Sequence, residues 1–126
     1  MRFLIDTQAL LWWLKDSQRL GPRARSRIAS GDPVVSPVVP WEIAIKTSLG
    51  KLVGDVGQIC SAISEGNFST LGFTNAHCVT LAALPFHHRD PFDRMLVSQA
   101  MVEGLPILTS DDKISLYGPK VLSAER

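Results

Sequence analysis

The chain has 126 residues, of which 45% are hydrophobic and 20% are charged, and its formal net charge is +1. This length suits one domain, and a charge so close to zero argues against a protein that holds nucleic acid through phosphates alone. No stretch approaches the roughly 20 apolar residues of a membrane span, and Asp6 interrupts the first apolar run before a signal peptide could form, so we expect a single cytoplasmic domain over residues 1–126 with no membrane segment.

Short apolar runs alternate with helical patterns in the first half of the chain. Proline suits the first turn of a helix and glycine the residue after its last turn, so Pro22 and Gly31 mark one helix clearly. In chain order we predict a strand at residues 3–5, helices over residues 7–14 and 22–30, a strand at residues 34–36, and a helix over residues 41–49.

The second half continues this alternation. Asp90 and Pro91 are typical of the cap and first position of a helix, and Gly104 is typical of its end. In chain order we predict a helix over residues 56–65, a strand at 70–73, a helix from the cap Thr74 to Leu84, the longest helix over 92–103, a strand at 105–109, a short helix at 113–116 and a strand at 121–122. Strands that alternate with helices indicate a three-layer α/β/α fold with a mostly parallel central sheet.

Two aspartates follow predicted strands. In such sheets ligands bind beyond the carboxyl ends of the strands, so Asp6 and Asp111 are expected at the same edge. Each has an ordinary alternative, because Asp6 could cap the helix that follows it, and either Asp111 or Asp112 could cap the next one. Asp111 is nearer to the strand and is therefore the better candidate for the crevice.

Two further acids lie on predicted helices beside apolar positions. Glu42 lies at the edge of an apolar stripe, although Lys46 four residues later offers an ordinary ion pair. Asp90 is fully explained as a cap before Pro91, whereas Asp93 shares its helix face with core positions. An unpaired carboxylate avoids such a place unless something compensates its charge, so Asp93 is the better candidate for function.

Asp6, Glu42, Asp93 and Asp111 are therefore predicted to meet at one end of the sheet. Carboxylates held close together must take up protons or bind a cation. Mg²⁺ and Mn²⁺ prefer oxygen ligands, and one or two such ions can activate water for attack on a phosphodiester. The pattern thus predicts a catalytic site for Mg²⁺ (or Mn²⁺) made of these four acids.

Four motifs in chain order resemble the PIN-domain ribonucleases of the VapC toxin type. They are FLIDTQALLWWL at residues 3–14, WEIAIK at 41–46, HHRDPFDR at 87–94 and LTSD at 108–111. The resemblance implies a PIN fold, metal-dependent endoribonuclease activity on RNA, and Asp6, Glu42, Asp93 and Asp111 as catalytic residues and metal ligands. It also implies a homodimer and a cognate VapB-like antitoxin. Gln8 departs from the family, which has His at that position.

Three residues near these acids could add supporting oxygen atoms. Thr7 follows Asp6, Ser36 ends the second predicted strand, and Asp112 follows Asp111. A hydroxyl at a strand end is more often a local cap, which is the alternative for the first two.

A basic rim beside an acidic pocket would suit a nuclease. Lys46, Arg89 and Arg94 are the candidate contacts to RNA. The neighbouring pair His87-His88 could suggest a zinc site, but two loop histidines without a nearby cysteine or third histidine are a weak pattern, and we discount it.

Two other functions are alternatives to a metal-dependent nuclease. Phosphatases with an aspartate nucleophile after the first strand need a second aspartate two positions later, where this chain has Gln8. A catalytically inactive PIN-fold interaction module is the remaining alternative, against which stands the presence of all four acids. A metal titration followed by incubation with RNA discriminates between the enzyme and the module.

Overall fold

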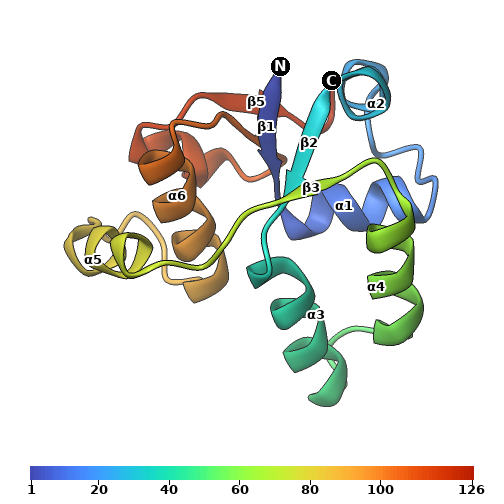
Figure 1. Cartoon of the computed structure of the whole chain (residues 1–126), viewed down its shortest axis with the longest axis horizontal. Coiled ribbons are helices and arrows are strands. Elements are labelled where there is room, and N and C mark those ends of the chain that lie inside the picture. Colours follow the sequence, from blue (N-terminus) through green and yellow to red (C-terminus); the bar gives the residue numbers. More distant parts are fainter.

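A computed structural model describes all residues, 1–126, and its centre is a five-stranded sheet with the order β3-β2-β1-β4-β5 (Figure 1). All four strand pairings are parallel. The strands are β1 (Arg2–Ile5), β2 (Asp32–Val35), β3 (Ser69–Thr70), β4 (Ile107–Thr109) and β5 (Val121–Ser123).

Helices cover both faces of the sheet, with α5 and α6 on one side and α1, α2 and α4 on the other (Figure 1). Their bounds are α1 (Thr7–Leu14), α2 (Pro22–Ser30), α3 (Val38–Ser48), α4 (Val56–Glu65), α5 (Asn75–Ala83), α6 (Pro91–Glu103) and the 3₁₀ helix η1 (Asp112–Tyr117). The predicted three-layer α/β/α architecture is therefore confirmed, and the sheet is parallel throughout. None of the helices is both long and apolar enough to cross a membrane.

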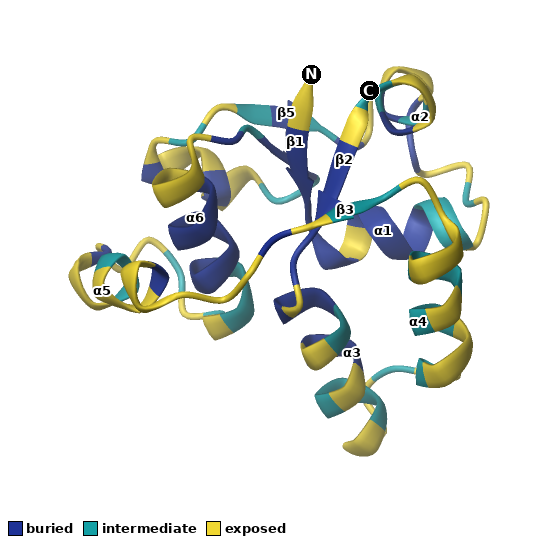
Figure 2. Cartoon of the chain, viewed as in Figure 1, coloured by how far each residue is buried: buried dark blue, intermediate teal, exposed yellow.

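The core lies between the sheet and its closest helices. Phe3, Leu4 and Ile5 of β1 are fully buried, as expected for a central strand of a parallel sheet. Helix α6 is buried over the continuous run 94–100, whereas α4 contributes no fully buried residue (Figure 2). Gly104 ends α6 with φ 66°, a left-handed conformation that glycine adopts without steric cost.

Helix α3 begins at Val38, three residues before the predicted start at Trp41. Pro40 lies before the predicted helix over residues 41–49 but within the first turn of α3. The first four backbone N–H groups of a helix have no intrahelical partner, so a proline there removes no hydrogen bond. As a result Glu42 lies in the second turn and is only 4% exposed.

Candidate functional site

The carboxyl ends of β1 and β4 open into an acidic pocket at the middle of the sheet. After β1 the chain continues toward β2 on one side, and after β4 it continues toward β5 on the other side. The two connections therefore leave the strand ends in opposite directions, which creates a crevice. This acidic pocket has a volume of about 220 Å³. Its lining includes Asp6, Glu42, Asp93 and Asp111, together with Thr7, Lys46 and Asp90.

Asp6 both caps a helix and faces the pocket. Its Oδ1 accepts a hydrogen bond from the backbone N–H of Ala9 at 2.8 Å, and its Oδ2 accepts one from the Thr109 hydroxyl at 2.5 Å. Burial raises the pKa of Asp6 to about 6, against the opposing effect of these hydrogen bonds, and the charges of Glu42 and Asp111 add to the increase. Asp6 is therefore both the cap of α1 and a lining residue of the acidic pocket.

Glu42 is held from both sides. The Thr7 hydroxyl donates to Oε1 at 2.6 Å, and the Lys46 ammonium lies 2.5 Å from Oε2. The hydrogen bond to Glu42 is the main cause that raises the pKa of Lys46. Thr7 thus donates a hydrogen bond to a pocket carboxylate, and Lys46 is the cation that compensates Glu42.

Asp93 lacks such compensation. Asp90 caps α6 by accepting from the backbone N–H groups of Phe92 and Asp93 at 2.9 and 3.0 Å, as predicted. The Asp93 carboxylate is mostly buried, and its nearest basic group, His88 Nε2, is 3.8 Å away, too far for a hydrogen bond. Burial, followed by the charge of Asp90, raises the pKa of Asp93 to about 8.

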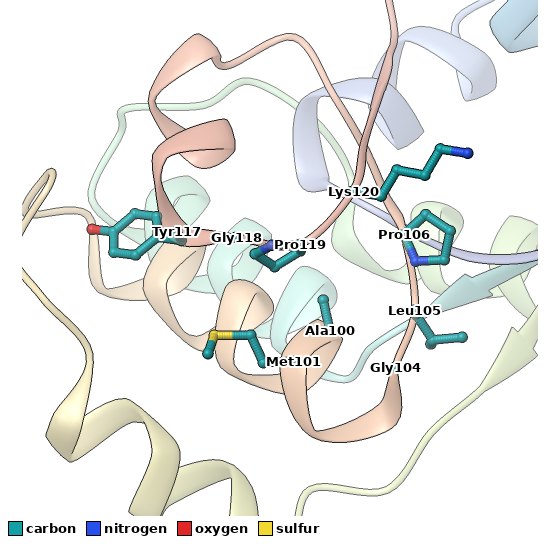
Figure 3. Close-up of a pocket in the computed structure, with 9 residues that line it drawn as sticks. All are labelled: Ala100, Met101, Gly104, Leu105, Pro106, Tyr117, Gly118, Pro119 and Lys120. Carbon is teal, nitrogen blue, oxygen red and sulfur yellow. The ribbon is translucent and has the colours of Figure 1, made fainter.

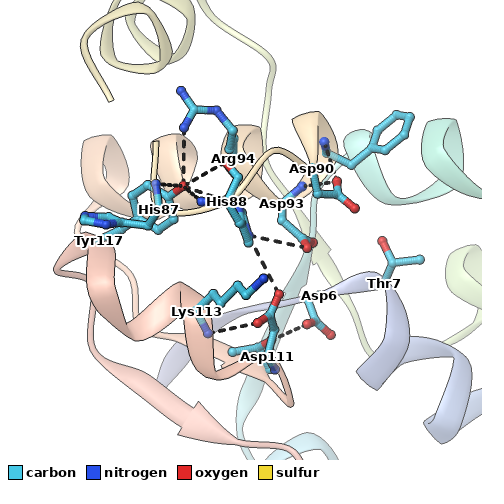
Figure 4. Close-up of polar contacts among 12 residues, drawn as sticks. Asp6, Thr7, His87, His88, Asp90, Asp93, Arg94, Asp111, Lys113 and Tyr117 are labelled. Carbon is cyan, nitrogen blue, oxygen red and sulfur yellow. Dashed lines mark hydrogen bonds and ion pairs between the residues drawn. The ribbon is translucent and has the colours of Figure 1, made fainter. Parts of the chain in front are cut away.

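His88 is the residue at this site that the sequence did not single out. Its Nε2 atom lies 3.7 Å from Asp111 Oδ2 and 3.8 Å from Asp93 Oδ2, and the ring is nearly buried (Figure 4). One ligand atom from each of His88, Asp93 and Asp111 lies within 4.8 Å of the others. The signal in the sequence is the pair His87-His88 just before Asp90-Pro91, which we discounted because no cysteine or third histidine lies nearby.

Comparison with known proteins gives the family. The PIN-domain family model matches residues 3–118. The chain belongs to the PIN-domain family. It is 27% identical over 115 residues to "Ribonuclease VapC22" of Mycobacterium tuberculosis (strain ATCC 25618 / H37Rv), which covers 88% of each chain.

Solved structures share the PIN fold. VapBC2 from Rickettsia felis, bound to a DNA fragment from its promoter, matches with a TM-score of 0.74 at 14% identity, over 98% of each chain. VapBC-1 from nontypeable Haemophilus influenzae matches with a TM-score of 0.69 at 15% identity, over 100% of each chain. The predicted resemblance to VapC-type PIN domains is thereby confirmed.

Two residues expected to support the site lie outside the acidic pocket of this PIN domain. Ser36 is buried, and its hydroxyl accepts from the backbone N–H of Val38 at 3.1 Å, which makes it a local cap of α3. Asp112 is exposed as the first residue of η1, while Asp111 caps that helix by accepting from the Lys113 N–H at 2.9 Å. Of the three candidates for supporting oxygens, the structure brings Thr7 alone to the pocket.

Arg94 does not lie where a contact to RNA requires it. Its side chain is buried, and its guanidinium donates to the carbonyls of Pro85 at 2.8 Å and Leu84 at 3.2 Å, and to the Tyr117 hydroxyl at 3.3 Å. The expectation of an RNA contact at Arg94 is therefore wrong, because this cation fastens the segment before α6. Arg89, by contrast, is exposed.

A larger hollow of about 610 Å³ lies at the opposite ends of the strands (Figure 3). Its lining includes Met101, Pro106, Tyr117 and Lys120, and it contains no carboxylate. A choice of site by volume alone would therefore select a hollow without any of the four acids. The chemistry favours the smaller acidic pocket.

The raised pKa values predict how stability depends on pH. The pKa values of Asp6 and Asp93 are about 6 and about 8 in the folded chain, against an ordinary value of 3.8. At pH values between the ordinary pKa and the raised pKa, each of these aspartates is protonated in the folded chain but ionised in the unfolded chain. The free energy of unfolding therefore falls as pH rises from about 4 to about 8. Urea denaturation in the presence of chelator should show this fall, and Asp93→Asn should flatten it above pH 6. A free energy that rises over this range would contradict the burial argument.

Proposed function

We propose that this PIN domain is an endoribonuclease that depends on a divalent metal ion and acts as the toxin of a toxin–antitoxin pair. The observation that carries the proposal is the convergence of four carboxylates from α3, α6 and the ends of β1 and β4 on one small pocket. Burial makes their combined negative charge unfavourable, so a cation would stabilise it. The curated relative is itself named a ribonuclease.

The donor atoms of the acidic pocket fit Mg²⁺ or Mn²⁺. Carboxylate oxygens are the preferred ligands of these ions, and the charges of Asp93 and Asp111 lack a close cation. Nearby, His88 Nε2 is buried without a hydrogen-bond partner, which indicates a missing neighbour at this point. A bound ion would activate water and neutralise the negative charge that develops on the cleaved phosphodiester.

The chain itself would hold this site rigid. Ala9 and Thr109 fix Asp6, while Thr7 and Lys46 fix Glu42, so the carboxylates keep their positions before any ligand arrives. Exposed Arg89 and half-exposed Lys46 are the cations that we propose for contact with RNA phosphates.

The decisive experiment is cleavage of labelled RNA by the purified protein with Mg²⁺ or Mn²⁺ and with chelator. We expect cleavage with either metal and none with chelator. An inactive interaction module would leave RNA intact under both conditions while still binding a protein partner.

We further propose a homodimer and a VapB-like antitoxin that inserts a helix into an apolar groove. Trp12 is buried, whereas half-buried Trp13 lines a hollow of about 330 Å³ together with Ile28 and Phe68. An amphipathic helix suits such a groove, and an arginine from the same partner could pair with the acids of the pocket. Several solved structures that share this fold are toxin–antitoxin complexes. Light scattering tests the homodimer.

Toxicity follows as an expected result in cells. Growth should stop when this chain is induced alone and resume when a small VapB-like partner is co-expressed. The Asp93→Asn variant should be harmless yet still capture the partner, because its groove is intact. A variant as toxic as the wild type would show that toxicity arises elsewhere.

A further inference from the structure

One buried nitrogen atom at the acidic pocket has no partner. The side chain of His88 is 7% exposed, and its Nε2 makes no hydrogen bond. Buried polar atoms of this kind are rare in folded proteins and call for an explanation. The neighbours of this atom are Asp93 Oδ2 at 3.8 Å and Asp111 Oδ2 at 3.7 Å (Figure 4).

These separations suit three atoms that share an ion. Ligand atoms about 2.1 Å from one metal ion lie between about 3.0 and 4.2 Å apart, depending on the geometry. The observed 3.7 and 3.8 Å fall within that range, whereas a direct hydrogen bond would require a closer approach. Both distances from His88 Nε2 thus suit a shared ion better than direct hydrogen bonds.

The far side of the His88 ring is also suited to ligation. Its Nδ1 lies 3.2 Å from the hydroxyl oxygen of Tyr117, and that hydroxyl can donate its own proton to the His88 carbonyl at 3.4 Å. Ligation requires the hydrogen atom on Nδ1, from which it would be donated to the Tyr117 hydroxyl oxygen, and the lone pair on Nε2. A second partner of this kind commonly fixes the tautomer and orientation of a metal-binding histidine.

We propose that His88 is a nitrogen ligand of the metal centre, beside Asp93 and Asp111, and that it makes the site prefer first-row transition ions such as Mn²⁺ over Mg²⁺. The inference rests on the proposed function, since it concerns the same metal. Mg²⁺ favours oxygen ligands and retains its waters, whereas an imidazole nitrogen strengthens the binding of transition ions.

Mn²⁺ itself is the probe. In the wild-type protein, electron spin echo spectra of bound Mn²⁺ should show coupling to ¹⁴N, replaced by a ¹⁵N pattern when histidine is ¹⁵N-labelled. In His88→Gln the coupling should vanish and calorimetry should show Mn²⁺ affinity lower by about 10-fold or more, with a smaller change for Mg²⁺. His87→Gln is the matched control, because His87 is the exposed neighbour, and it should keep both signals.

Three results would overturn the proposal. Mn²⁺ that binds without histidine coupling would show that His88 only balances the carboxylates, and the proposed nuclease would still stand. A wild-type protein that binds Mg²⁺ but no Mn²⁺ would overturn the role of His88 alone, and one that binds neither ion would overturn both. Circular dichroism checks the fold of His88→Gln. If this variant is unfolded, the spectrum of His87→Gln decides, because histidine coupling retained there leaves His88 as the ligand; the third histidine, His77, is buried elsewhere, beside Gln99 and Glu103.

Discussion

Replacement of Asp93 by Asn is expected to lower metal-dependent RNA cleavage by more than about 100-fold while the chain stays folded, because even the outer partners of metal ligands are worth 10- to 100-fold. The amide has nearly the same shape but no charge, and it offers one oxygen instead of two. Asp93 is the acid whose pKa is raised furthest, to about 8, so a negative charge at this position lowers the stability of the metal-free protein. Loss of that charge should therefore remove activity and slightly stabilise the metal-free protein.

Asp90→Asn is the matched control for Asp93→Asn. Both residues line the acidic pocket, but Asp90 Oδ1 is occupied by two backbone N–H groups at the start of α6. Asn caps a helix about as well as Asp, so this variant should retain most of its activity. Rates are measured with labelled RNA and Mn²⁺ at several pH values. Wild-type cleavage by Asp93→Asn would remove Asp93 from the proposed site.

Replacement of Arg94 by Met is expected to lower the free energy of unfolding by about 2–4 kcal/mol, because the buried carbonyl of Leu84 and the partly buried carbonyl of Pro85 lose a charged donor. The guanidinium donates to Leu84 and Pro85 and packs 4.0 Å from the ring centroid of Phe86. Met retains the apolar stem of the side chain but none of its donors. Urea denaturation measures the difference.

Arg89→Met is the control for Arg94→Met. Arg89 is exposed in the same segment, and surface substitutions usually change stability by less than about 0.5 kcal/mol. An equally small change in stability for Arg94→Met would show that water can satisfy the two carbonyls. It would contradict the conclusion that Arg94 holds the segment before α6 in place.

Local chemistry made most of the helices predictable. Helices α1, α2 and α4 have the predicted bounds, and α6 begins at Pro91 and ends before Gly104 as its cap residues indicate. Two of the errors lie where local signals have two interpretations. Pro40 suits either the residue before a helix or its first turn, and Pro106 precedes β4 rather than forming part of it.

The acids were predictable because their positions depend on the topology of a parallel sheet. His88 and Arg94 were not, because their environments depend on how the segment between α5 and α6 folds back toward Tyr117. His88, discounted from the sequence, lies with its Nε2 atom beside Asp93 and Asp111, and Arg94, expected to contact RNA, is buried.

The hydrogen bond between Thr109 and Asp6 joins residues 103 positions apart in the chain, and it does so across the neighbouring strands β1 and β4. Contacts over such distances form late in folding, because a long loop must close before they are gained. No fragment of the chain can therefore assemble the four acids by itself. The acidic pocket requires the pairing of β1 with β4, so local unfolding at this pairing would separate the acids and remove the site.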